Sequence, residues 1–200
     1  MNEAKPKSFH HGSLREAAIH AVLDFVVREG HLDFSLREIA KACDVSAPAF
    51  YRHFESKEVI LIEVAKRGYE MFYDKLSYAS QLHASLPAEE RVRELGMAYI
   101  EFALQHEGHY RVIFNRDLHS LASYKNIKPM ADQLFNLLKN IVSEHIGDNE
   151  ENQKEAERTT LQAWSVVHGL SHLWLSRVLS QFTEAQFLKM SRGIVATKLI

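Results

Sequence analysis

The chain has 200 residues, of which 46% are hydrophobic and 25% are charged, with four prolines, eight glycines and one cysteine. This composition favours an all-α globular protein and excludes an internal disulfide framework, and no apolar stretch approaches the roughly 20 residues of a membrane-spanning helix. The net charge of −2 excludes nucleic-acid binding by bulk positive charge, but a local cluster of basic residues would still suffice for specific binding.

The first twelve residues are predicted to form a flexible arm. They lack the apolar segment of a secretory signal, and one cysteine fits a reducing compartment, so we expect a cytoplasmic protein. An ordinary chain terminus is one interpretation of this arm. The other is that its basic side chains reach phosphates or a minor groove; these are Lys5, Lys7, His10 and His11.

Three capped helices are predicted over residues 13–55. Ser13 caps the first helix, and Ser35 caps the second with Glu38 three residues later, which completes a capping box. Ser46 caps a third helix with a proline in its first turn, where the missing N–H costs little. Two short helices joined by a tight turn are typical of a helix-turn-helix, although a plain helical hairpin gives the same pattern.

The outer face of the third predicted helix favours the DNA-binding interpretation. Its alanines at 47 and 49 permit close approach to a backbone, and Tyr51, Arg52 and His53 carry groups that donate hydrogen bonds to phosphates. Lys57 follows at the start of the next helix. Cys43 lies on the inner face of the second helix, where we expect it to be inert.

This part of the chain resembles the tetracycline-repressor family of bacterial transcriptional regulators. The matching segments are Val-Ser-Ala-Pro-Ala-Phe-Tyr-Arg-His-Phe-Glu-Ser-Lys-Glu at 45–58, Phe-Ser-Leu-Arg-Glu-Ile-Ala at 34–40 and His-His-Gly-Ser-Leu-Arg-Glu-Ala at 10–17. The resemblance implies a homodimer on a roughly palindromic operator whose half-sites lie about 34–36 Å or more apart. Residues 46–53, Ser46 included, would enter a major groove. Phosphate contacts are expected from Ser35, Arg37, Tyr51, His53 and Lys57, and contacts to base edges from Ala47, Pro48, Ala49 and Arg52.

The remaining chain, residues 56–200, is predicted to form a helical ligand-binding and dimerisation domain. Apolar periodicity and caps predict helices over about 56–78, 87–105, 109–114, 129–146, 151–181 and 183 to near the C-terminus. Residues 115–127 are mixed in character and are interpreted as a loop, with a helical turn within it as the alternative. The whole protein should therefore be all-α, with about nine helices. The long helix beginning at Ser56 would link the two domains mechanically.

The helix predicted at 151–181 is apolar on two faces, so both faces need cover. We expect one face to line the domain interior and the other to pack on a second subunit, with the last helix, in a four-helix dimer interface. The predicted interface residues are Val167, Leu170, Trp174, Val178, Phe187 and Ile194.

A second, shorter resemblance is Trp-Ser-Val-Val-His-Gly-Leu at 164–170, similar to the Trp…His-Gly signature of one C-terminal subtype of the same family. The family resemblance implies a pocket for a small, largely apolar effector whose binding is transmitted to the DNA-reading helices. Most aromatic residues at helical spacing are simply core, so the pocket is a hypothesis. Its candidate lining is Met97, Ile100, Phe102, Tyr110, Phe114, Leu134, Leu138, Trp164 and His168.

No cofactor, metal or enzymatic activity is predicted. His168 and His172 have metal-ligand spacing, but the glutamate of a His-Glu-x-x-His motif is absent, and a hydrogen-bonded core histidine explains His168 more simply. The main prediction is thus a ligand-responsive DNA-binding regulator, for which the family resemblance implies repression. The alternative is a helical protein that binds a small molecule or a metal without binding an operator.

Overall fold

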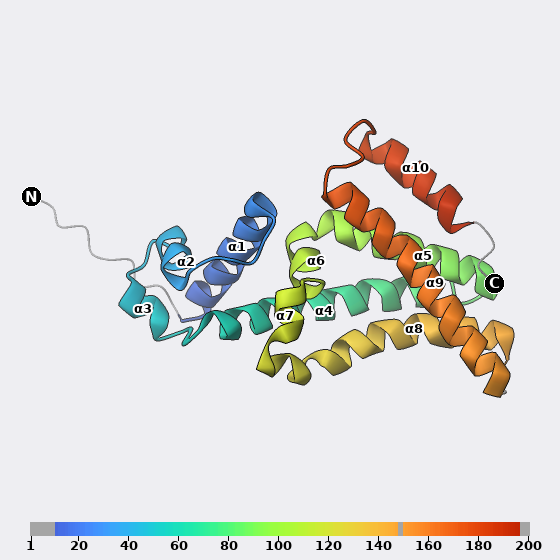
Figure 1. The fold of residues 1–200 in the computed structure, drawn as a ribbon, viewed down its shortest axis with the longest axis horizontal. Helices are drawn as coiled ribbons and strands as arrows, with labels where there is room; N and C mark the ends of the chain where they lie inside the picture. The colour runs from blue at the N-terminus through green and yellow to red at the C-terminus, as the bar shows by residue number, and fades with distance from the viewer. Residues whose placement is uncertain (1–10, 148–149, 197–200) are drawn as a thin grey trace, which may run out of the picture.

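The computed structural model describes residues 11–147 and 150–196, and within these ranges every element is helical (Figure 1). The predicted all-α fold is confirmed. Most of the predicted N-terminal arm lies outside the described residues. The elements are α1 (His11–Glu29), α2 (Leu36–Ala42), α3 (Ala47–Tyr51), α4 (Lys57–Leu82), α5 (Ala88–Gln105), α6 (Glu107–Ile113), α7 (Arg116–Ser120), the 3-10 segment η1 (Ala122–Asn126), α8 (Lys128–Ile146), α9 (Glu150–Leu175) and α10 (Glu184–Val195).

Helices α1, α2 and α3 form a small unit at one end of the molecule (Figure 1). The Ser35 hydroxyl accepts a hydrogen bond from Glu38 N at 3.2 Å, and the Glu38 carboxylate accepts one from Ser35 N at 2.7 Å, as the capping box predicts. The Ser46 hydroxyl accepts one from Ala49 N at the start of α3. Asp44, between the helices, has a φ of 55°, the left-handed conformation that lets the chain reverse in a tight turn.

The core of this unit is aromatic. Phe50 and Phe54 are both fully buried, with ring centroids 5.1 Å apart, and Phe25 meets Phe34 edge-on at 5.7 Å. Residues four apart on a helix share a face, which explains why Phe50 and Phe54 turn inward while the intervening residues face outward.

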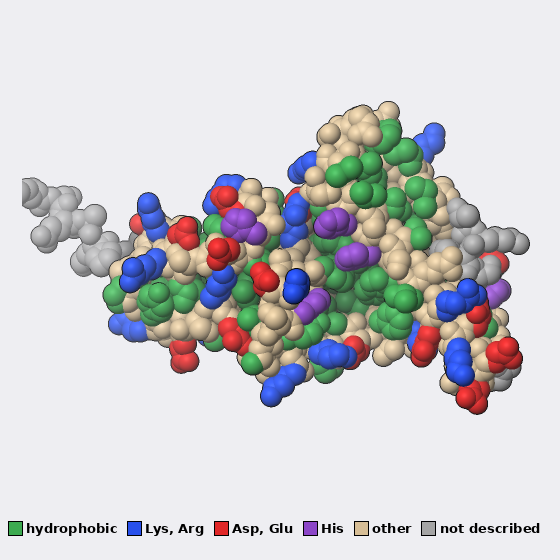
Figure 2. Space-filling model, viewed as in Figure 1, with side chains coloured by type: hydrophobic (Ala, Val, Ile, Leu, Met, Phe, Trp, Pro, Cys, Tyr) green, Lys and Arg blue, Asp and Glu red, His purple; other side chains and the backbone are tan. Residues whose placement is uncertain are grey.

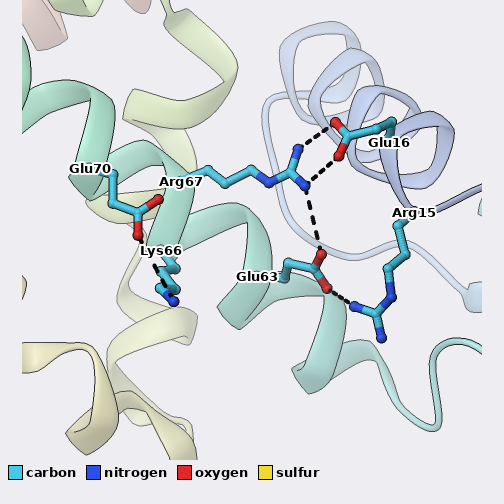
Figure 3. A network of polar contacts seen from close by, with 6 residues as sticks. All are labelled: Arg15, Glu16, Glu63, Lys66, Arg67 and Glu70. Carbon is cyan, nitrogen blue, oxygen red and sulfur yellow. Dashed lines mark hydrogen bonds and ion pairs between the residues drawn. The ribbon is translucent and has the colours of Figure 1, made fainter. Parts of the chain in front are cut away.

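Helix α4 joins the small unit to the rest of the molecule. Its first half carries ion pairs to α1, in which Arg15 lies 2.5 Å from Glu63, and Arg67 holds both carboxylate oxygens of Glu16 at 2.5 and 2.6 Å (Figure 3). Glu63 also lies 3.9 Å from Arg67, so one carboxylate is shared by two guanidinium groups. These pairs are partly exposed and join α1 to α4 at the surface, where solvent screens them.

The second half of α4 packs among α5, α6 and α8, with α9 crossing α5 and α8 and α10 covering α5 and α9 (Figure 1). Phe72 of α4 stacks on Phe102 of α5 at 4.2 Å. Helix α10 is held to α5 by an ion pair between Arg192 and Glu94 at 2.6 Å, and its Phe187 stacks on Trp174 of α9 at 4.5 Å.

Three predicted helix boundaries are wrong. Helix α1 begins at His11, so Ser13 lies within this helix and is not its N-cap. Helix α4 continues to Leu82, because Leu76 and Ala79 extend its buried face and nothing before His83 breaks the helix. The segment 115–127, for which a loop or a helical turn was predicted, contains α7 and η1; α7 is started by Asn115, whose side chain accepts from Asp117 N at 2.8 Å. Helix α9 ends at Leu175, where the Arg111 guanidinium donates to the Leu175 carbonyl.

Helix α6 contacts both α1 and α4 at glycines. A Cβ on Gly108 would lie 3.0 Å from Cδ2 of Leu23 on α1, and a Cβ on Gly68 of α4 would lie 2.9 Å from Cγ2 of Ile113. The Gly68 position also abuts His109 at 3.3 Å. Close backbone approach at these two glycines makes α6, beside α4, a second contact between the N-terminal unit and the remaining helices.

His109 predicts a pH-dependent stability. Burial, followed by the charges of His106 and Arg67, lowers the pKa of His109 to about 4, and its Nε2 has no hydrogen-bond partner among the described residues. The unfolded chain takes up this proton near pH 6.5 while the folded protein stays neutral. The stability is therefore complete above pH 6.5 and falls by about 1–3 kcal/mol as the pH drops towards 4, allowing for partial exposure of the ring.

Urea unfolding at pH 7.5, 6 and 5 measures this effect, with His109→Phe as the matched variant that cannot titrate. We expect a flatter dependence on pH in the variant. Some slope will remain, because burial also lowers the pKa of His106 and of His168. Equal slopes for the two proteins would contradict the assignment to His109.

Candidate DNA-binding and effector sites

The predicted DNA-binding residues lie on α2, on α3, in the segments that flank them and at the start of α4, and all are exposed or partly exposed. Arg37 and Arg52 are exposed, as is Tyr51 at 43%, and Lys57 is partly exposed. Phenolic, guanidinium and ammonium donors thus face solvent. The remaining members of the set are exposed (Ser35, Ser46, Pro48) or partly exposed (Ala47, Ala49, His53).

An open groove of about 370 Å³ lies between α2 and α3. Arg37 and Lys41, four residues apart on α2, line it together with Ser46 and Ala47. The sequence analysis did not include Lys41. Its spacing from Arg37 was the available signal, because residues i and i+4 on a helix share a face.

Lys57 has two partners within the protein. Its Nζ lies 3.6 Å from Asp33 and 4.8 Å from the centre of the Phe34 ring. It therefore helps hold the start of α4 against the loop before α2, as well as being a candidate phosphate contact.

A polar cluster lies in the interior between α5, α6 and α9. The hydroxyls of Tyr99 and Tyr110 approach Nδ1 of His168 at 2.9 and 3.0 Å. One ring nitrogen offers a single lone pair or a single N–H, so it cannot satisfy both hydroxyls fully. Burial lowers the pKa of His168, raises that of Tyr110 to about 12 and raises that of Tyr99 well above its ordinary value, which keeps all three groups neutral near pH 7.

The apolar interior beside this cluster is nearly filled. The cavity that adjoins Tyr99, Leu138 and Trp164 has a volume of about 20 Å³, room for roughly one water molecule. Four predicted lining residues lie in the core and line neither this cavity nor the pocket described next: Met97, Ile100, Phe102 and Leu134. An effector in this apolar region would have to displace side chains.

A larger pocket, of about 280 Å³, opens at the junction between the N-terminal unit and the helical domain. Three predicted effector residues line it, namely Tyr110, Phe114 and His168. Residues from the end of α1 and from the ends of α6 and α9 complete the lining of this pocket. They are distant in the chain, so no signal in the sequence indicated that they would lie together. Figure 2 shows histidine side chains in the middle of this face of the molecule.

The exposed apolar surface of α9 and α10 differs from the predicted interface. Val167 and Phe187 are buried inside the protomer, because their side chains pack on α5 and on Trp174. Leu170 and Trp174 are partly buried, whereas Val178 and Ile194 are exposed. Large exposed apolar side chains that the prediction omitted are Leu161, Leu173 and Met190. Figure 2 shows hydrophobic side chains gathered over α9 and α10.

The glycines of these two helices face open space. A Cβ on Gly169 of α9 or on Gly193 of α10 would meet no atom of the protomer within 4 Å. Two helices can approach closely at such positions, so this face suits packing against another helix pair.

Among the described residues, no three or more His, Cys, Asp or Glu side chains are grouped so as to hold a metal ion, so His168 and His172 lack a third ligand there. No described helix is both long and apolar enough to cross a membrane.

Comparison with protein families gives two matches. Residues 26–64 match the model described as bacterial regulatory proteins of the tetR family, and residues 92–190 match the tetracyclin repressor-like C-terminal domain. Together the two models account for well over half of the chain. Neither description names the Trp…His-Gly subtype, which stays a prediction.

The chain is also similar to individual proteins, and the solved structures among them share its fold. The chain is 23% identical over 162 residues to YobS of Bacillus subtilis, an uncharacterised HTH-type transcriptional regulator, covering 81% of this chain and 79% of YobS. A protein of unknown function from Rhodococcus sp. RHA1 superposes with a TM-score of 0.72 at 24% identity, covering 95% of this chain and 97% of that one. AibR, solved with isovaleryl coenzyme A and operator DNA, superposes with a TM-score of 0.70 at 14% identity, covering 93% and 98%.

Proposed function

Because the chain belongs to the tetracycline-repressor family of bacterial regulatory proteins, we propose that it binds a palindromic operator as a homodimer and that a small-molecule effector releases it. The observation that carries this proposal is the outward face of α2 and α3. There, Arg37, Tyr51 and Arg52 are exposed on a unit whose aromatic side chains are buried behind them. Binding to DNA implies a place in the cytoplasm.

We further propose that residues 13–55 form the DNA-binding domain and residues 56–200 the effector and dimerisation domain. Residues 46–53 would enter the major groove, with Lys41 added to the expected phosphate contacts. The Tyr99–Tyr110–His168 cluster would anchor the polar part of an effector. Helix α6 carries Tyr110 on one side and contacts α1 at Gly108, so movement at the cluster has a short route to the DNA-binding domain.

An effector that binds the DNA-free arrangement more tightly would shift the population away from DNA. Operator DNA would weaken effector binding by the same factor, because the coupling free energy is reciprocal.

Selection of bound fragments from a random DNA pool tests the proposed function. We expect enrichment of sequences with two-fold symmetry. If purified protein enriches no sequence at low salt, the regulator function is wrong, and a small-molecule-binding protein without an operator becomes the better interpretation.

If the exposed face of α9 and α10 is the dimer interface, a charge introduced on it should break the dimer. Leu173→Glu should convert the dimer to a monomer, because the two-fold axis places two carboxylates in one apolar interface at a cost of about 3–5 kcal/mol or more. Analytical ultracentrifugation measures the shift in dimer dissociation, which we expect to exceed about 100-fold.

Leu82→Glu is the matched control, because Leu82 is also exposed (61%) but lies at the end of α4. That variant should remain dimeric. A dimeric Leu173→Glu protein would place the interface on another surface.

A further inference from the structure

The junction pocket is lined by residues of both proposed domains. Val26 and His31 come from the end of α1 and the loop after it, and Leu175 comes from the end of α9. Figure 1 shows the end of α1 and the C-terminal end of α9 lying on either side of this region, with α6 beneath them. A molecule bound here would touch the DNA-binding unit and the helical domain at the same time.

Apart from the Tyr110 hydroxyl, the titratable side chains that line the pocket are basic. They are two arginines and three histidines, namely Arg111, Arg116, His31, His168 and His172, and no acidic side chain lines it. Arg116 is exposed and makes no ion pair with any residue that the structure describes. A guanidinium group presents its donors in a planar fork that matches a carboxylate.

Arg111 is held in place at the back of the pocket. Its Nε donates to Glu107 at 2.8 Å, and its Nη2 donates to the carbonyl of Leu175. Glu107 also lies 3.9 Å from Arg177, so this group of three keeps one positive charge. An anion in the pocket therefore meets Arg116 and a net positive charge behind it.

The helix ends at the pocket oppose an anion only weakly. The carbonyl ends of α1 and α9 carry partial negative charge, each equivalent to about half an elementary charge. Gly30 N donates to the Val26 carbonyl at 2.9 Å, and Arg111 donates to the Leu175 carbonyl, so both ends already have donors. The full positive charge on Arg116 exceeds the partial negative charge that remains at these two helix ends.

Tyr110 and Asn115 add polar groups to the lining, and its apolar part is small in extent. Val26, Phe114 and Leu175 provide it, and the Phe114 ring lies 4.7 Å from the His168 ring. At about 280 Å³ the pocket is just below the usual range of about 300–1,000 Å³ for small-molecule sites. Its volume and chemistry suit a short apolar chain with a single anionic group.

We propose that this junction pocket is a binding site for a short-chain monocarboxylate, with the carboxylate on Arg116 and His172 and the apolar chain against Phe114 and Leu175. The proposal deepens the proposed function, on which it rests for the consequence of binding. The bound acid joins α1 to α6 and α9, and so fixes the DNA-binding unit relative to the helical domain. It differs from an effector site inside the apolar core, where the cavity holds only about 20 Å³.

Calorimetric titration of the full-length protein without DNA tests the site. The probes are straight-chain acids of about four to eight carbons, the primary amides of the same chains, and inorganic phosphate, each up to about 10 mM. The variants are Arg116→Gln and His172→Gln. Arg158→Gln is the matched control, because Arg158 carries the same charge on the exposed surface of α9 and pairs only with Glu155 there.

We expect at least one acid to bind the native protein and Arg158→Gln equally, and to bind at least tenfold more weakly to Arg116→Gln. Its amide should bind at least tenfold more weakly than the acid, and phosphate should not compete with it. Any one of four results would overturn the proposal. These are failure of every acid to bind, equal binding of acid and amide, competition by phosphate, and an unchanged affinity in Arg116→Gln.

The readout involves no DNA, so it is separate from the test of operator binding. An acid that binds as expected to a protein that selects no operator would support the site and refute the proposed function. The reverse result would leave the regulator function standing with another effector.

Discussion

Phe54→Ala should lower the free energy of unfolding by about 3–5 kcal/mol and abolish DNA binding, because truncating a buried phenylalanine leaves a cavity that the surroundings fill only partly. Phe54 is fully buried, its ring lies 5.1 Å from that of Phe50, and the Arg15 guanidinium lies 5.3 Å from its centre. This loss is a large part of the roughly 5–15 kcal/mol that stabilises a typical domain.

Chemical denaturation followed by circular dichroism measures the change. Tyr51→Ala is a matched control, because it removes an aromatic ring three residues away whose side chain is 43% exposed. That substitution should cost less than about 0.5 kcal/mol, as expected for an exposed position. Equal destabilisation by both substitutions would mean that Phe54 does not hold the unit together.

Arg52→Ala should weaken binding of the dimer to its selected operator about 10²–10⁴-fold, because each half-site loses a charged hydrogen bond of roughly 1.5–3 kcal/mol. The exposure of Arg52 at the end of α3 puts its guanidinium on the surface that would face DNA. Fluorescence anisotropy with a labelled duplex at fixed ionic strength measures the affinity.

Arg158→Gln serves as the control for loss of one positive charge far from α3, and its affinity should stay within about twofold, since a distant exposed charge acts weakly across solvent. The ratio of affinities for operator and scrambled duplex separates two roles for Arg52. A falling ratio indicates a base contact, and an unchanged ratio indicates a phosphate contact. Unaltered operator affinity would remove Arg52 from the interface.

The N-terminal unit was predictable because its local signals agree with its fold. The capping box at Ser35 and Glu38 and the cap at Ser46 fix helix starts through hydrogen bonds within four residues of each other. The spacing of Phe50 and Phe54 fixes which side faces inward. Such signals depend on short stretches of sequence, so a single sequence is enough to predict these helix starts and the buried face.

The effector region was predictable only in part. Tyr110, Phe114 and His168 were correctly grouped as neighbours, but the junction pocket also needs His31 and Arg116, which only tertiary packing brings together. The faces of α9 posed a similar problem. Both are apolar, and periodicity cannot tell the face that packs on α5 from the face that remains exposed.

The ion pairs between α1 and α4 have a consequence for how DNA affinity depends on salt. In a simple protein–DNA equilibrium, the slope of log affinity against log salt reports the number of phosphates neutralised through counterion release. Here added salt also weakens the exposed pairs of Arg15 with Glu63 and of Arg67 with Glu16, and so loosens the unit that must dock. The measured slope would then exceed the number of phosphates contacted, and Glu16→Gln would bring it closer to that number.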